Sequence, residues 1–244
     1  MSGASMAAGR RPDLVGIGEI LMDMTPAEGP RGPCFQANPG GAPCNFLAMA
    51  ARMGSSVAFI GKVGDDAFGR RLRAALEEAG VDATGLLVDP EAATTLAFVH
   101  LAPSGDRSFS FYRRGCADTM LRPGELDPGV LDGCRALYCG SLAFSDEPLR
   151  SAADLLLSRA RERGLIVFHD SNYRPALWSS PRTALETMRA LVARADVLKV
   201  SDDEALMLTG EAEPGQARCR EPHGFGGDFL LVRVLPQDRC ATLR

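Results

Sequence analysis

The chain of 244 residues contains only two lysines, Lys62 and Lys199, so arginine supplies nearly all of its positive charge. Its 27 basic residues are outnumbered by 31 acidic ones, and the formal net charge is −4. A general nucleic-acid-binding surface requires a local excess of positive charge. The composition therefore excludes that class of function, and we expect no nucleic-acid partner.

Long apolar segments are also missing. No run approaches the roughly 18 apolar residues that a membrane-spanning helix requires, and residues 1–11 lack the apolar core of a secretory signal. We therefore expect no membrane partner and a cytoplasmic location. Targeting to an organelle by a short N-terminal segment is left open.

Metal-binding and disulfide patterns are absent as well. The seven cysteines include no C-x-x-C pair, and the three histidines lie far apart at 100, 169 and 223. A zinc site or a disulfide framework is therefore not expected, and no side chain is predicted to bind a metal directly. The dinucleotide fingerprint fails because Leu21 stands where its third glycine is needed, and a P-loop fails because Val63 replaces its serine or threonine.

What the sequence does contain is an alternation of strand and helix patterns from residue 14 to residue 210. Buried strands are predicted at 14–20, 57–62, 136–139, 165–169 and 197–200, and helices at 42–53, 67–79, 148–163, 182–193 and 202–208. This alternation predicts an α/β fold with a mostly parallel sheet and helices on both of its faces. Residues 94–112 interrupt it with a predicted β-hairpin, which we interpret as a small accessory lobe.

Three groups of polar residues occupy positions where such a sheet binds ligands. Asp23 follows the first predicted strand, and the ligand sites of open α/β sheets lie beyond the carboxyl ends of their strands. The paired glycines Gly40 and Gly41 precede a helix that carries Asn45 in its first turn, so backbone amides can approach a ligand there. Polar residues at 170–174 and 199–204 follow two further strands. Each group could also be an ordinary solvated turn.

Taken together, these groups resemble the pfkB, or ribokinase-like, carbohydrate kinases, and most closely the fructokinase branch. Eight segments match in the family's order, over about residues 13–210. They read GEILMD at 18–23, NPGGAPCNFLAMAARMG at 38–54, FIGKVGDDAFGRRL at 59–72, GVDATGL at 80–86, TTLAFVHLAPSGDRSFSFYR at 94–113, AD at 117–118, DSNYRPALW at 170–178 and KVSDDEALMLTG at 199–210.

The resemblance implies a ribokinase-like central sheet flanked by helices, with a small β lid that includes residues 94–112 and closes over a small-molecule sugar. It implies transfer of the γ-phosphoryl group of ATP to a sugar hydroxyl, with Mg²⁺. Because a lone β-hairpin is marginal in water, we expect the lid either to pair with a second copy, as a homodimer, or to stay mobile. The residues that match the family's sugar site are Asp23, Gly40, Gly41, Asn45, Arg107 and Arg113. Those that match its nucleotide, phosphate and Mg²⁺ region are Asn172, Arg174, Lys199 and Glu204.

One family motif is not found. The catalytic signature D-T-x-G-A-G-D provides amides for the moving phosphoryl group and an aspartate base, and only Asp228 within GFGGD at 224–228 echoes it weakly. We therefore divide the chain into a truncated kinase domain, 13–210, and a divergent tail, 211–244, with the C-terminal part of the fold incomplete. Whether the chain is an enzyme stays open, and low or no activity is expected. The alternatives are a non-catalytic sugar-binding or regulatory protein, and a pfkB kinase for 2-keto-3-deoxygluconate or a nucleoside.

Overall fold

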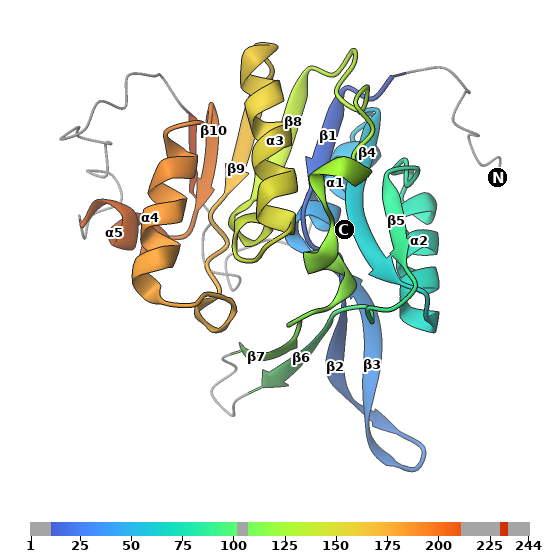
Figure 1. Cartoon of the computed structure of the whole chain (residues 1–244). Coiled ribbons are helices and arrows are strands. Elements are labelled where there is room, and N and C mark those ends of the chain that lie inside the picture. The colour runs from blue at the N-terminus through green and yellow to red at the C-terminus, as the bar shows by residue number, and fades with distance from the viewer. Residues whose placement is uncertain (1–10, 102–106, 211–229, 234–244) are drawn as a thin grey trace.

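A central sheet of seven parallel strands forms the frame of the protein in the computed structural model, which describes residues 11–101, 107–210 and 230–233 (Figure 1). In spatial order its strands are β11 (Leu230–Arg233), β10 (Val197–Val200), β9 (Ile166–Asp170), β8 (Ala136–Gly140), β1 (Leu14–Ile17), β4 (Val57–Gly64) and β5 (Leu86–Asp89). The predicted α/β fold with a mostly parallel sheet is thereby confirmed. Strand β5 was not among the predicted strands.

Helices cover both faces of this sheet. Helices α3 (Leu149–Glu162) and α4 (Pro181–Val192) lie on one face, α1 (Ala42–Arg52) and α2 (Ala67–Glu78) lie on the other, and α5 (Asp202–Thr209) lies near β10 (Figure 1). Alternate residues of each strand point to opposite faces. Val15 and Ile17 therefore pack into the core beneath α3, whereas Leu14 and Phe59 pack against α1 and α2.

Short polar side chains and one glycine fix where the helices begin and end. The Asp66 carboxylate accepts a hydrogen bond from the Gly69 amide at the start of α2, and Ser180 accepts one from Thr183 at the start of α4. Helix α5 ends at Gly210, whose φ of 78° is left-handed and suits glycine. These caps set helix boundaries within two residues of those predicted.

A second sheet of four strands projects from the first, and we call it the lid. Its order is β3 (Gly32–Gly40), β2 (Leu21–Gly29), β6 (Leu96–Leu101) and β7 (Arg107–Tyr112). The predicted hairpin at 94–112 is therefore only half of it. The expected first strand, 14–20, also differs, because β1 ends at Ile17 and the chain then turns at Gly18–Ile20 into the lid. Asp23 consequently lies within lid strand β2 rather than at the end of a strand of the main sheet.

No helix in the described ranges is long and apolar enough to cross a membrane. Four short 3-10 turns complete the described structure: η1 (Ala117–Met120), η2 (Pro123–Glu125), η3 (Ser141–Phe144) and η4 (Pro175–Leu177). Asp228, the weak candidate for a base, lies outside the described residues.

Candidate sugar and phosphate site

The lid grows from the carboxyl end of the parallel sheet, because β1 leads directly into β2 and β3 leads back into α1. Parallel strands share one direction, so the carboxyl ends of β8, β9 and β10 lie at the same edge as this junction. Polar residues that follow those strands therefore lie at the edge from which the lid rises. This edge holds most of the residues predicted from the sequence.

Asp23 is placed at the centre of the lid by its register. It pairs with Asn38 of β3 on one side and with Ala97 of β6 on the other. The backbone of Gly40 lies so close to the Asp23 carboxylate that an added Cβ would be 2.2 Å from Oδ2. Burial raises the pKa of the Asp23 carboxyl above its ordinary value, and the positive charge of Arg174 opposes that rise. The structure thus brings Asp23, Gly40 and Arg174 together.

Arg174 connects the lid with the main sheet. It precedes the short turn η4, and its guanidinium carbon lies 5.7 Å from the ring centre of Phe109 in β7, a cation–π distance. Phe109 is on the same face of the lid as Asp23, since Val99 pairs with Phe109 and Ala97 pairs with Asp23. Arg174 is therefore held between this face and the end of β9.

Lys199 and Asp170 form an ion pair at the ends of β10 and β9. The Lys199 ammonium lies 2.7 Å from Oδ2 of the buried Asp170. The Tyr138 hydroxyl donates to the same oxygen at 3.0 Å, and burial raises the pKa of Tyr138 well above its ordinary value. The Asn172 amide donates to the other Asp170 oxygen, Oδ1, at 3.2 Å, and Asn172 has a left-handed φ of 30°. Asp170 thereby fixes both Lys199 and the turn at 171–173.

Glu204 is held by backbone amides rather than left open to a metal. Its Oε1 accepts the Tyr173 amide at 2.6 Å, and its Oε2 accepts the Ser201 amide at 2.8 Å. It therefore closes the capping box of α5 and ties that helix to the segment before Arg174. No group of three or more potential metal-ligating side chains occurs in the part of the chain that the structure describes.

Gly41 and Asn45 surround the start of α1. Gly41 has a left-handed φ of 115°, and an added Cβ would lie 2.6 Å from the Glu19 carbonyl oxygen, so only glycine fits there. Asn45 is exposed and lines a cavity of about 70 Å³ that Gly40 also lines. The Gly40 end of this turn is thus adjacent to Asp23, whereas Asn45 lies at the cavity between α1 and α2.

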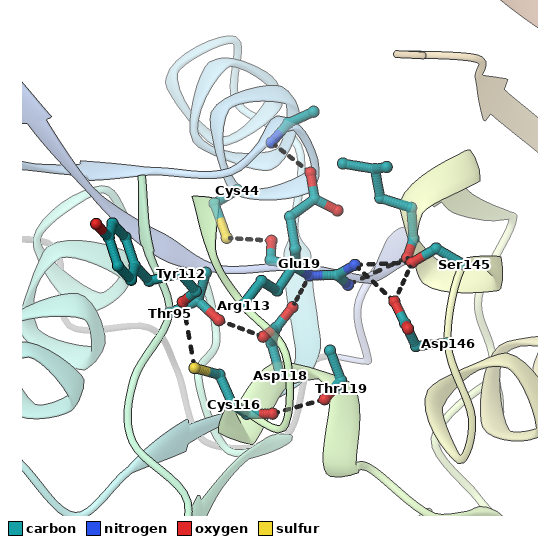
Figure 2. A network of polar contacts seen from close by, with 12 residues as sticks. Glu19, Cys44, Thr95, Tyr112, Arg113, Cys116, Asp118, Thr119, Ser145 and Asp146 are labelled. Carbon is teal, nitrogen blue, oxygen red and sulfur yellow. Dashed lines mark hydrogen bonds and ion pairs between the residues drawn. The ribbon is translucent and has the colours of Figure 1, made fainter. Parts of the chain in front are cut away.

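The two predicted arginines of the lid have different positions. Arg107 begins β7. Arg113 directly follows β7, and its guanidinium is buried, with Nε donating to Asp118 at 2.7 Å and Nη1 to the Ser145 hydroxyl at 2.7 Å (Figure 2). Its Nη2 donates to the Leu142 carbonyl at 3.1 Å. Protein groups therefore already occupy the donors that were expected to reach a sugar.

Glu19 is a buried carboxylate that the sequence reasoning missed. Its side chain is 2% exposed, and Oε1 accepts the Ala42 amide at the start of α1 at 3.1 Å (Figure 2). Burial raises the pKa of this carboxyl to about 7, against the attraction of Arg113, which lowers it. The signal that could have identified Glu19 was an acidic residue inside the otherwise apolar run of 14–22.

Comparisons with known proteins agree with this geometry. A family model described as "pfkB family carbohydrate kinase" matches residues 11–232. The chain is 39% identical over 206 residues to a probable fructokinase-4 of Arabidopsis thaliana, covering 83% of this chain and 63% of that protein. It is 40% identical over 207 residues to fructokinase-1 of Oryza sativa subsp. japonica, covering 83% and 64%.

Solved structures show the same likeness. The crystal structure of a fructokinase from Xylella fastidiosa superposes with a TM-score of 0.75 at 32% identity, covering 82% of this chain and 62% of that one. A structure of a Vibrio cholerae O395 fructokinase with fructose, ADP and calcium ion bound superposes with a TM-score of 0.75, also at 32% identity, covering 84% and 65%.

The chain spans about three fifths of the length of the curated relatives described above. The family match extends to residue 232, beyond the boundary at 210 that the motifs indicated, and this extension includes all but the last residue of β11. A match over most of the chain, together with the order of the motifs and the lidded parallel sheet, leads to one conclusion: the chain belongs to the pfkB family of carbohydrate kinases.

Proposed function

We propose that this chain provides the sugar-binding part of an ATP-dependent, fructokinase-like kinase, which transfers the γ-phosphoryl group to a hydroxyl of fructose. The observation that carries the proposal is the meeting of Asp23, Gly40 and Arg174 on one face of the lid. The curated relatives are named fructokinases, and one of the similar structures is described as holding fructose. The kinase domain is proposed to begin at about residue 13.

The sugar side of the site is suited to a polyhydroxyl ligand. A half-buried carboxylate such as Asp23 accepts hydrogen bonds from hydroxyl groups, and these bonds gain strength when one partner is charged. Gly40 has no side chain that could cover the Asp23 carboxylate. Arg174 is near enough that its charge stabilises the ionised form of Asp23. We therefore assign Asp23 the role of holding sugar hydroxyls.

The phosphate side is suited to anions. Arg174 and Lys199 place two positive charges beyond the carboxyl ends of β9 and β10, and Asp170 holds the Lys199 ammonium in position. Phosphoryl transfer depends mainly on positioning and on charge stabilisation of this kind. ATP would supply the phosphoryl group, and these two cations fit its phosphates. We assign no direct ligand to Mg²⁺; each Glu204 oxygen accepts one backbone amide.

The first prediction concerns the Asp23 carboxylate. Asp23→Ala should reduce the affinity for fructose at least tenfold. The sugar hydroxyl groups that donate hydrogen bonds to Asp23 would lose their acceptor, although binding would still remove them from water. Isothermal titration calorimetry with fructose measures this directly. Glu28→Ala, in the same strand but near its far end, serves as the matched control and should bind like the wild type.

Equal affinities of the wild type and Asp23→Ala would contradict the assignment of Asp23. Binding of 2-keto-3-deoxygluconate or a nucleoside in place of fructose would retain a pfkB kinase site but change its substrate. Binding of fructose without any ADP formation, even when a family C-terminal part is joined to the chain, would favour the alternative of a non-catalytic sugar-binding or regulatory protein.

A further inference from the structure

Buried polar side chains lie at the roots of three of the four lid strands. Glu19 precedes β2, Thr95 precedes β6, and Arg113 follows β7. Asp118, in η1, joins Arg113 to Thr95 (Figure 2). We call Glu19, Thr95, Arg113 and Asp118 the hinge cluster. The fourth strand, β3, reaches it through the Gly40–Gly41 turn, which packs on the Glu19 backbone.

Arg113 and Asp118 form the fixed part of the cluster. Their side chains are 2% and 0% exposed and meet at 2.7 Å. The second Asp118 oxygen accepts the Thr95 hydroxyl at 2.5 Å. A buried ion pair is stable only where its remaining donors and acceptors are also satisfied, and here they are satisfied from both ends of the β6–β7 hairpin. Asp118 therefore ties the two roots of that hairpin together.

Arg113 also joins the lid to the main sheet. Its remaining nitrogens donate to the Leu142 carbonyl and to the Ser145 hydroxyl, in the segment that links β8 to α3. The Asp146 carboxylate lies 3.4 Å from Nη1 as well. A rotation of the lid about its root would have to break several of these buried contacts together. The side chain of Arg113, which directly follows the last strand of the lid, thus holds the lid to the edge of the main sheet.

Glu19 acts on the other half of the lid, where the sugar-binding turn lies. Helix α1 has no side-chain cap of its own, because its N-cap residue is Gly41. The Glu19 carboxylate takes the place of that cap by accepting the Ala42 amide. The Glu19 carbonyl accepts the Cys44 thiol at 3.8 Å. One residue therefore contacts the turn through both its side chain and its backbone.

The other carboxylate oxygen of Glu19 provides an independent observation. Oε2 is buried and has no hydrogen-bond partner among the residues that the structure describes. Leaving a buried carboxylate oxygen unpaired costs free energy, so Glu19 is not explained by fold stability alone. The charged or titratable groups that face it are Arg113, Asp118, Cys44 and Tyr138.

We propose that Glu19 is a positioning residue, which holds the Gly40–Gly41 turn in its sugar-binding geometry and couples that turn to the Arg113–Asp118 anchor at the root of the lid. The part of this inference that concerns sugar affinity rests on the proposed function. The part that concerns the attachment of the lid does not. The two parts can therefore be tested separately.

Amide hydrogen exchange measured by mass spectrometry tests the attachment of the lid. Glu19→Ala removes the acceptor for the Ala42 amide, and the amides of β2 and β6 should exchange at least fivefold faster than in the wild type. Glu19→Gln keeps an acceptor oxygen of the same reach, and its lid amides should exchange no more than twofold faster than those of the wild type. Thr95→Val, which removes the hydroxyl from Asp118, should accelerate β6 and serves as a second variant if Glu19→Ala does not fold.

Leu156→Ala is the control for general destabilisation. It opens a cavity in the core beneath α3 without touching the hinge cluster, and it should accelerate exchange in β4 but leave the lid within twofold of the wild type. Lid rates in Glu19→Ala and Thr95→Val that equal those of the wild type would overturn the inference. Lid rates as fast in Glu19→Gln as in Glu19→Ala would also overturn it.

Fructose calorimetry on the same proteins tests the effect on the site. The affinity of Glu19→Ala should fall at least tenfold, and Glu19→Gln should recover it to within threefold of the wild type. Unchanged affinity in Glu19→Ala would overturn the positioning role. If the wild-type protein itself bound no fructose, the proposed function would fail, and the exchange measurements would still decide whether Glu19 holds the lid.

Discussion

The buried carboxylate of Glu19 lowers the free energy of unfolding when it is ionised. At a pKa of about 7 instead of the ordinary 4.5, keeping it ionised above neutral pH costs about 3 kcal/mol at 1.36 kcal/mol per pKa unit. That is a considerable share of the 5–15 kcal/mol by which domains of this kind are stable. As the pH falls below 7 the folded protein takes up a proton at Glu19, and the cost decreases until it is gone below about pH 4.5.

The sign of this effect leads to a prediction about pH. Because the folded pKa is raised, the contribution of Glu19 to stability is fully present below about pH 4.5 and is lost as the pH rises to about 7. Glu19→Gln does not titrate. The free energy of unfolding of Glu19→Gln relative to the wild type should therefore rise by about 2–3 kcal/mol between pH 5 and pH 8, which urea denaturation measures.

A second buried titratable group, His169, does not affect this comparison. Burial lowers the pKa of its imidazole to about 4, so its contribution to stability is present above the ordinary 6.5 and is lost as the pH falls. This change occurs in both proteins and cancels in their difference. A difference in unfolding free energy that stays constant from pH 5 to pH 8 would show that Glu19 does not titrate in this range.

At the scale of elements, the main sheet could be predicted and the first half of the lid could not. The sheet strands are apolar runs bounded by turns, which indicate buried strands directly. Strands β2 and β3 contain Pro26, Pro33 and Pro39, and Gly29 and Gly32 lie where they meet. Proline and glycine indicate turns in a single sequence. Pairing with β6 and with each other overrides that preference, as β-structure often does.

The outer face of the lid carries exposed aromatic side chains. Phe35, Phe98 and Tyr112 form a row of ring contacts, with centroid distances of 5.0 Å and 5.5 Å, on the face opposite Asp23. Phe35 is 50% exposed and Tyr112 is 64% exposed. Covering exposed aromatic surface is favourable. We propose that a second copy of this chain covers it, which gives a homodimer through the lid.

The corresponding prediction is that Tyr112→Ser shifts the protein toward the monomer and weakens the dimer at least tenfold, as sedimentation velocity across a concentration series would show. Met53 is 81% exposed at the end of α1, away from the lid, so Met53→Ser is the matched control and should sediment like the wild type. A wild-type protein that stays monomeric at every concentration would contradict assembly through the lid.

At the scale of the whole molecule, some site residues can be identified from their position after a strand, whereas the contacts of others depend on how distant parts of the chain pack. The segments at 170–174 and 199–204 were found because they follow strands of the sheet. The engagement of Arg113 with Asp118 could not be predicted, since an arginine in a lid motif looks the same whether it reaches a ligand or a buried carboxylate. Glu19 was missed for the same reason, because its partner, the Ala42 amide, is 23 residues away.

Catalysis also depends on the whole molecule, and the printed sequence lacks the family's D-T-x-G-A-G-D signature. General-base assistance contributes about 10²–10⁴-fold, and each missing donor to developing charge costs about 10²–10³-fold. We therefore predict that residues 1–244 turn over ATP and fructose at least about 10³-fold more slowly than the same chain joined to a family C-terminal part. A coupled assay for ADP compares the two.

Asp228→Ala should leave any residual rate of the 244-residue chain unchanged. Comparable rates for the two proteins, or a loss of rate in Asp228→Ala, would mean that residues 211–244 hold a working base.

The position of β1 in the sheet has a consequence for synthesis of the chain. This first strand lies between β4 and β8, so one of its edges is paired by residues 57–60 and the other only by residues 136–139. At roughly 5–20 residues per second, a ribosome needs on the order of ten seconds to travel from β1 to β8. During that interval the nascent protein presents an open, apolar strand edge, to which another chain can pair. Synonymous codons that slow translation between residues 60 and 136 should therefore lower the soluble yield.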